Sequence, residues 1–222
     1  MGNKSKQTSY MTLMTHIKTC VEEVDNRSEA FTKALELLHK IGEEKINLDE
    51  MCHCQGLPLY RHNLYLVDAF YLFLGECYDF ALDDDTGTVD YILAKKYYTV
   101  SNQPAAKWRL GKMYLDKKLR YDGNVQVIAG RLIVEAINGL INELGDPHYF
   151  GKKLDYLGDM YQDIYPMGYP KTYYEILRWI IEHQNHLQAE HSSFVTRLCE
   201  FDVPPQSEAD QEILDQIYSF AI

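Results

Sequence analysis

The feature that constrains this chain most is a short pattern that occurs three times, Leu-Gly-x-x-Tyr. The three copies occupy residues 74–78, 110–114 and 157–161, so that consecutive copies begin 36 and 47 residues apart. Residues i and i+4 share one face of an α-helix, so the leucine and tyrosine of each copy form an apolar stripe with the glycine beside it. A pattern repeated at about 20–50 residues is typical of an array of stacked helical units.

The glycine in each copy carries a separate prediction. A glycine inside an exposed helix costs about 0.8–1 kcal/mol relative to alanine. Three helices that keep glycine at the same position, Gly75, Gly111 and Gly158, therefore indicate close contacts with neighbouring helices. We expect another helix to pack against each glycine too closely to leave room for a side chain.

The segments after the first and third copies of the pattern indicate helix pairs. Residues 83–87 form an acidic loop with a glycine, ahead of the aromatic-rich residues 90–98. Residues 166–170 form a loop of proline and glycine, ahead of the apolar residues 173–180. A helix, a loop and a second helix, and then the next glycine-bearing helix, predict a chain of αα-hairpins.

This arrangement resembles the SEL-one-like repeats, which are relatives of the tetratricopeptide repeats. Their unit combines a Leu-Gly-x-x-Tyr core with a loop that usually carries glycines and a second helix with alanine and paired aromatic residues. The matching residues of the best unit are Leu74, Ala94, Tyr97, Tyr98, Ala105 and Tyr114. The resemblance covers about residues 65–187. It departs in the second unit, which is 11 residues longer, and in Leu177, which replaces the alanine of the third.

The resemblance implies an all-α fold, a right-handed α-solenoid of stacked antiparallel helix pairs with about 9–11 helices. Apolar spacing also predicts helices outside the repeats, at residues 8–24, 28–41, 190–200 and 208–221. The expected organisation is a disordered start over residues 1–7, N-terminal capping helices and an irregular loop over 8–61, three repeats over 62–188, and C-terminal capping helices over 189–222.

Charge and cysteine content limit the partners and the compartment. The 222 residues carry a net charge of −11, which argues against nucleic acid and anionic membrane surfaces and favours a protein partner with a basic face. Solubility alone is the alternative explanation of this charge. Apolar runs stop short of a membrane span, and no secretory leader is visible. Five scattered cysteines favour a reducing, cytoplasmic setting.

Catalytic and metal-binding patterns are weak. The chain has no glycine-rich phosphate loop, no nucleophile elbow and no His-Glu-x-x-His motif. Two sets of residues have metal-binding types: Cys52, Cys54 and His62, and His183, His186 and His191 with Glu182 or Glu190. The first lacks a fourth ligand at suitable spacing, and the second is also explained as a solvated polar face. No catalytic, cofactor or metal site is therefore assigned, and we do not expect an enzyme.

Candidate partner-binding residues come from the resemblance, because tetratricopeptide-like arrays bind ligands through first-helix positions that flank the glycine. The corresponding residues are Glu76, Asp79, Trp108, Lys112, Asp116, Asp155, Asp159 and Asp163. The last three recur every four residues, where like charges repel and do not favour the helix. We expect a concave, acidic groove that receives a basic or amphipathic segment. Trp108 is either an exposed anchor of that groove or a core residue.

The sequence therefore predicts a protein–protein interaction adaptor or scaffold that binds a peptide or protein partner. The first alternative is an immunity or host-interaction protein that sequesters one tight partner. A self-associating structural protein and an enzyme of unknown reaction type are further alternatives, because one fold can host many functions.

Overall fold

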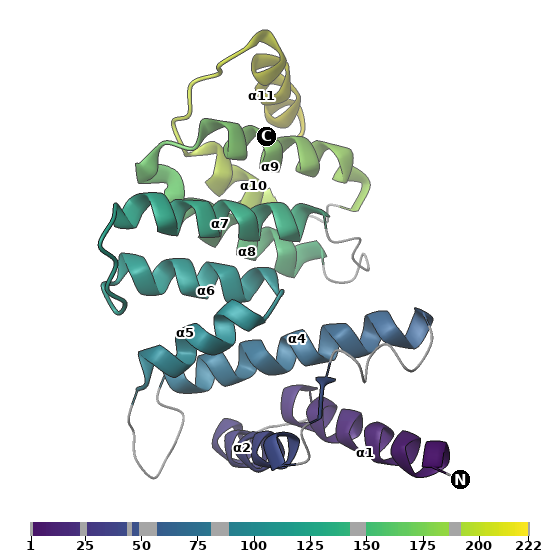
Figure 1. Ribbon diagram of the computed structural model, residues 1–222. Helices are drawn as coiled ribbons and strands as arrows, with labels where there is room; N and C mark the ends of the chain where they lie inside the picture. The colour runs from purple at the N-terminus through teal and green to yellow at the C-terminus, as the bar shows by residue number, and fades with distance from the viewer. Residues whose placement is uncertain are drawn as a thin grey trace. The chain divides into compact units, whose positions relative to one another are not determined.

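The computed structural model is all-helical over the residues that it describes, which are 2–22, 26–43, 46–48, 57–80, 89–142, 150–186 and 192–221. This part of the chain contains ten α-helices and no β-strand (Figure 1). The chain divides into two compact units, Met1–Ala106 and Lys107–Ile222. The predicted all-α class is confirmed.

The first unit is organised around helix α4 (Leu57–Asp79), which packs against α1 (Gly2–Glu22), α2 (Arg27–Glu43) and α5 (Tyr91–Val100). The sequence of α4 is apolar around most of its circumference, as a helix with neighbours on several sides requires. Its buried residues share one core with α1 and α2, which includes Leu13, Ile17, Ala30, Phe31, Ala34, Leu66, Phe70 and Leu74.

Buried polar groups in this unit are bonded. Asp68 of α4 is 8% exposed, and its carboxylate accepts hydrogen bonds from the backbone and side-chain amides of Asn102, each at 3.1 Å. Its carbonyl accepts a hydrogen bond from the Ser101 hydroxyl at 2.8 Å. These bonds attach the segment after α5 to the middle of α4, which is consistent with the rule that buried polar groups are paired.

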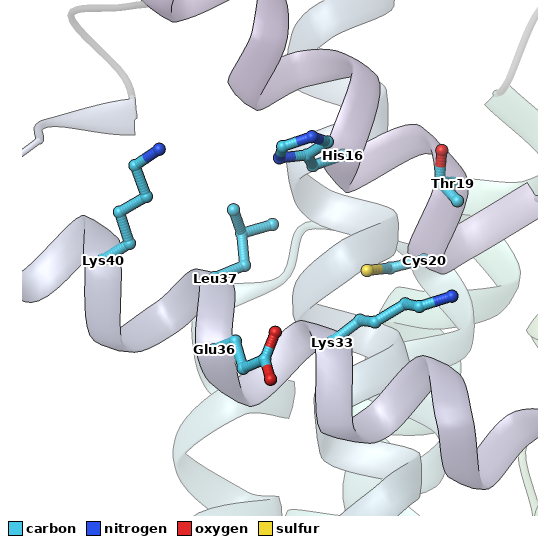
Figure 2. A pocket seen from close by; sticks show the side chains of 7 residues that line it. All are labelled: His16, Thr19, Cys20, Lys33, Glu36, Leu37 and Lys40. Carbon is cyan, nitrogen blue, oxygen red and sulfur yellow. The ribbon is translucent and has the colours of Figure 1, made fainter.

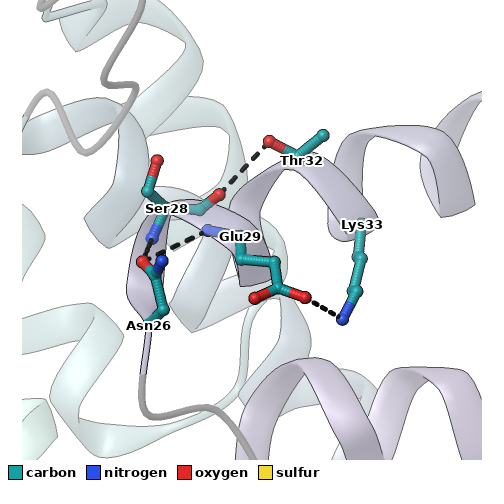
Figure 3. A network of polar contacts seen from close by, with 5 residues as sticks. All are labelled: Asn26, Ser28, Glu29, Thr32 and Lys33. Carbon is teal, nitrogen blue, oxygen red and sulfur yellow. Dashed lines mark hydrogen bonds and ion pairs between the residues drawn. The ribbon is translucent and has the colours of Figure 1, made fainter.

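Helix α2 begins with a side-chain cap (Figure 3). The Asn26 Oδ1 atom accepts hydrogen bonds from the backbone amides of Ser28 at 3.1 Å and Glu29 at 3.5 Å. Glu29 also pairs with Lys33 one turn later, on the outer face of the helix. Asn26 is the residue before Arg27, where helix α2 begins, and asparagine is among the residues preferred at this position.

The second unit begins within α6 (Pro104–Leu115). It also contains α7 (Val125–Asn142), α8 (Phe150–Ile164), α9 (Pro170–Glu182), α10 (Ser192–Cys199) and α11 (Glu208–Ala221), with short 3-10 turns at Tyr165–Met167 and Gln184–His186. Helix α7 packs against α8 and α9, α8 against α10, and α9 against α11. One core joins them, built from residues such as Ile133, Ile137, Leu157, Tyr161, Tyr173, Ile176, Ile180, Leu198 and Ile217.

Helix α7 is long and apolar enough to cross a membrane by length and composition. The same helix buries Ala129, Ile133 and Ala136 completely and carries Arg131 and Glu135 on its exposed side. This amphipathic division is the one expected of a helix that covers a protein core.

Helix boundaries differ from the sequence prediction at two places. Helix α1 begins at Gly2, so residues 2–7, which we expected to be disordered, are helical. These residues have no apolar pattern of their own, and they extend a helix nucleated further on, where each added residue gains a hydrogen bond. Helix α4 begins at Leu57, within the segment expected to be an irregular loop. Pro58 is tolerated there because the first turn has no intrahelical amide bonds to lose.

The repeated glycines were predicted to lie where a neighbouring helix packs closely. A Cβ atom at Gly75 would lie 2.4 Å from the Tyr98 ring of α5, and one at Gly111 would lie 2.8 Å from Ile133 Cγ1 of α7. It would also lie 3.2 Å from the Ala129 carbonyl oxygen. Gly158 is buried in α8. The first two glycines therefore let the next helix approach closely, as predicted.

We predict that Gly111→Ala destabilises the protein by about 1–3 kcal/mol, because the new methyl group overlaps Ile133 and the α7 backbone. This cost exceeds the gain in helix propensity, which is at most about 1 kcal/mol. Gly42→Ala is the matched control, since Gly42 is helical and has no atom within 4 Å of the position of an added Cβ. In chemical denaturation, the free energy of unfolding of Gly42→Ala should equal or exceed that of wild type. A Gly111→Ala variant as stable as wild type would contradict the prediction.

Candidate functional site

Three of the predicted residues, one on α8 and two on α6, are joined by two polar contacts. The Trp108 indole Nε1 donates a hydrogen bond to Asp163 Oδ2 at 2.7 Å, and Lys112 Nζ lies 3.4 Å from Asp163 Oδ1. Trp108 is only 6% exposed, so its N–H would be costly to leave without an acceptor. Asp163 therefore connects α6 to α8 across 55 residues of sequence.

Trp108 is a core residue. Its ring belongs to the main core of the second unit, with the Arg109 guanidinium 5.2 Å and Lys112 Nζ 5.5 Å from the ring. The Tyr156 ring meets it edge-on at 5.9 Å. Of the two alternatives for Trp108, the structure shows the core one, so this indole is not the exposed aromatic group of a binding surface.

The exposed face of α8 carries the remaining predicted carboxylates. Asp155 and Asp159 are both exposed, and Asp159 Oδ1 lies 4.0 Å from Arg197 Nη2 of α10, a loose surface pair. Tyr156 lies between them in sequence and is 43% exposed, although one edge of its ring rests on Trp108. The face thus combines two carboxylates with one supported aromatic ring.

The other predicted residues lie elsewhere. Glu76 pairs with Arg27 at 3.7 Å and its side chain is 16% exposed, while Asp79 is 5% exposed and accepts a hydrogen bond from the Tyr98 hydroxyl at 3.4 Å. Both belong to the first unit, where they serve internal contacts. Asp116 lies just after the end of α6.

A cavity beside the α8 face was not predicted from the sequence. It has a volume of about 300 Å³ and is lined by Gly158 and Gln162 of α8 and by Arg197, Leu198, Glu200 and Phe201 in and after α10. Tyr156 could have been found from its position, because residues 155, 156 and 159 share the helix face opposite to Leu154 and Leu157. The cavity has no such signal, since α8 and α10 meet only through tertiary packing.

A second pocket lies between α1 and α2 in the first unit (Figure 2). It has a volume of about 420 Å³ and is lined by His16, Thr19 and Cys20 of α1 and by Lys33, Glu36, Leu37 and Lys40 of α2. Cys20 and Leu37 are buried and form an apolar floor. Lys33 is paired with Glu29, so the positive charge at this wall is partly neutralised.

The two thiols that the structure describes in the first unit, those of Cys20 and Cys77, are buried, and burial favours their protonated form. Burial raises the pKa of Cys20, an effect that Lys33 partly opposes. Burial, with a contribution from Glu76, raises the pKa of Cys77 to about 12. A thiol is a nucleophile only as the thiolate, so burial makes Cys20 and Cys77 poorer nucleophiles than exposed cysteines.

Metal-ligand clusters are absent from the described residues. The Nδ1 atom of His183 lies 2.8 Å from the Trp179 carbonyl oxygen, and its ring lies 4.8 Å from that of Trp179. This histidine is therefore held against its own helix. Glu182 is exposed. The remaining candidate ligands, Cys52, Cys54, Glu190, His191 and the side chains of His62 and His186, lie outside the described residues.

We predict that Asp163→Ala destabilises the protein by about 1–3 kcal/mol, because it leaves the buried Trp108 N–H without its acceptor. Asp159→Ala removes a carboxylate from the exposed face of the same helix and should change the free energy of unfolding by less than about 0.5 kcal/mol. Urea denaturation of both variants measures the difference. Equal stabilities would show that Asp163 does not carry this structural role.

The buried Cys77 thiol predicts an alkaline loss of stability. Its pKa is 9.0 in an unfolded chain and about 12 in the fold, so above pH 9 only the unfolded chain releases the proton and unfolding becomes easier. Cys77→Ala should reduce the fall in stability between about pH 9 and 10 by up to about 1.4 kcal/mol per pH unit. Val67→Ala, which also shortens a buried side chain of α4, is the control and should keep the wild-type pH dependence. An unchanged slope in Cys77→Ala would refute the prediction.

No match to this chain was found among protein-family models, curated protein sequences or solved structures. The function of the protein is therefore inferred from its own residues.

Proposed function

We propose that this protein is a protein–protein interaction adaptor, and that the exposed face of α8 binds a basic segment of a partner protein. The observation that carries the proposal is the α8 face, defined by Asp155, Tyr156 and Asp159. It presents a tyrosine that is 43% exposed on the same helix face as two exposed carboxylates.

The chemistry of this face fits arginine or lysine side chains. A carboxylate accepts two parallel hydrogen bonds from a guanidinium group, and a tyrosine ring attracts a cation placed over it. Asp155 and Asp159 stand one turn apart, where their charges repel by a few tenths of a kcal/mol. A cation bound between them removes this repulsion. The pair of carboxylates therefore binds a basic group more favourably than an isolated surface carboxylate does.

The support beneath Tyr156 also favours binding. Its ring rests edge-on against Trp108, whose indole is held in place by the hydrogen bond to Asp163. A side chain that is already positioned loses less conformational entropy when a partner binds. Asp163 and Lys112 therefore act in this proposal as supports of the binding face, and Asp155, Tyr156 and Asp159 make the contacts.

Stacked helix pairs of the SEL-one-like type are the architecture that we propose for the adaptor. The close contacts of α5 at Gly75 and of α7 at Gly111 support two such pairs. The contact between Tyr161 of α8 and Tyr173 of α9, with ring centroids 5.2 Å apart, supports a third. The free thiols of Cys20, Cys77 and Cys199 are compatible with the cytoplasmic location that forms part of the proposal.

The test is affinity capture from the native lysate with quantitative mass spectrometry, using three forms of the protein as bait. Wild type should enrich proteins with basic segments, and Asp155→Lys with Asp159→Lys should lower their recovery by about tenfold or more, because like charges now face each other. Glu212→Lys with Asp215→Lys makes the same change of charge on the exposed side of α11 and should leave recovery intact. Equal recovery by all three baits would refute the proposal.

A further inference from the structure

The three repeated glycines have different surroundings. Tyr98 fills the space beside Gly75, and Ile133 fills the space beside Gly111. Gly158, at the corresponding position of α8, is buried and lines the cavity of about 300 Å³ between α8 and α10.

The deep walls of this cavity are apolar and firmly held. Leu198 is 1% exposed, and its carbonyl oxygen accepts a hydrogen bond from the Tyr173 hydroxyl at 3.1 Å. The Phe201 ring packs against Tyr161 at 5.2 Å and Tyr165 at 4.8 Å. The cavity is therefore preformed, as binding pockets usually are.

The rim of the cavity is charged and continuous with the α8 face. Arg197 lines the cavity and lies 4.0 Å from Asp159. Glu200 and Gln162 also line the cavity. Among the residues that define the α8 face and the described residues that line the cavity, Asp155, Asp159 and Glu200 are acidic and Arg197 is basic. These charges favour a basic chain over an acidic one.

We propose that this cavity receives one large apolar side chain, preferably aromatic, of the same basic partner segment that binds the α8 face. The inference rests on the proposed function and adds its specificity: the carboxylates select a basic chain, and the cavity selects an apolar anchor within it. A volume of about 300 Å³ lies at the lower end of ligand pockets and suits a single side chain. Buried aromatic anchors in such pockets commonly dominate the energy of an interface.

The experiment uses two fluorescent synthetic peptides, short and lysine-rich, that differ only in a central tryptophan or serine. Fluorescence anisotropy with the full chain at low salt should show the tryptophan peptide binding about tenfold more tightly, as expected for burying one large apolar side chain. Gly158→Leu fills the cavity and Phe201→Ala removes its aromatic wall. Each should reduce the preference to about twofold or less, with circular dichroism confirming that the variant is folded.

The outcomes separate the two proposals. In one outcome, wild type binds both peptides with equal affinity, and the variant Asp155→Lys with Asp159→Lys binds neither. That result would refute the proposed role of the cavity and support binding at the α8 face. A tryptophan preference that survives in both Gly158→Leu and Phe201→Ala would also refute the cavity, because the anchor would then bind elsewhere, such as on Tyr156. Failure of both peptides to bind would refute both proposals.

Discussion

The close approach of helices at glycine is the constraint on which the described packing depends. Tyr98 meets α4 at Gly75, and Ile133 meets α6 at Gly111, at distances that no Cβ atom would allow. Helices as short as α5, with 10 residues, and α6, with 12, are marginal in isolation. Their stability therefore comes from burial against neighbours, and the missing side chains of the glycines bring the apolar stripes of each pair into contact.

Helix α8 shows how one helix serves both the core and the surface. Leu154, Leu157 and Tyr161 are buried, whereas Asp155 and Asp159 are exposed on the opposite side. Asp163 lies where the two faces meet and accepts the Trp108 hydrogen bond. Three aspartates with equal spacing thus divide into one that stabilises the fold and two that remain exposed, and only their environments distinguish them.

Polar groups buried in the described part of the chain have partners, and none of their side-chain nitrogen or oxygen atoms lacks a hydrogen bond. Asp68 and Asp79 show how acidic residues in α4 are accommodated, through Asn102 and the Tyr98 hydroxyl. The net charge of −11 is therefore not all available to partners. Only the carboxylates that remain exposed can attract a basic partner, and in the second unit these include Asp155 and Asp159.

Local pattern alone was sufficient for much of the helical structure. The sequence predicted a helix over residues 208–221, which is the range of α11, and it predicted closely packed glycines at positions 75 and 111. These features depend on residues three or four positions apart. The order of residues in the sequence therefore shows directly which side chains share a helix face. The burial of Trp108, its bond to Asp163 and the cavity at Gly158 depend on contacts between helices that are distant in sequence. Those contacts result from how α6, α8 and α10 pack, and only the tertiary structure decided them.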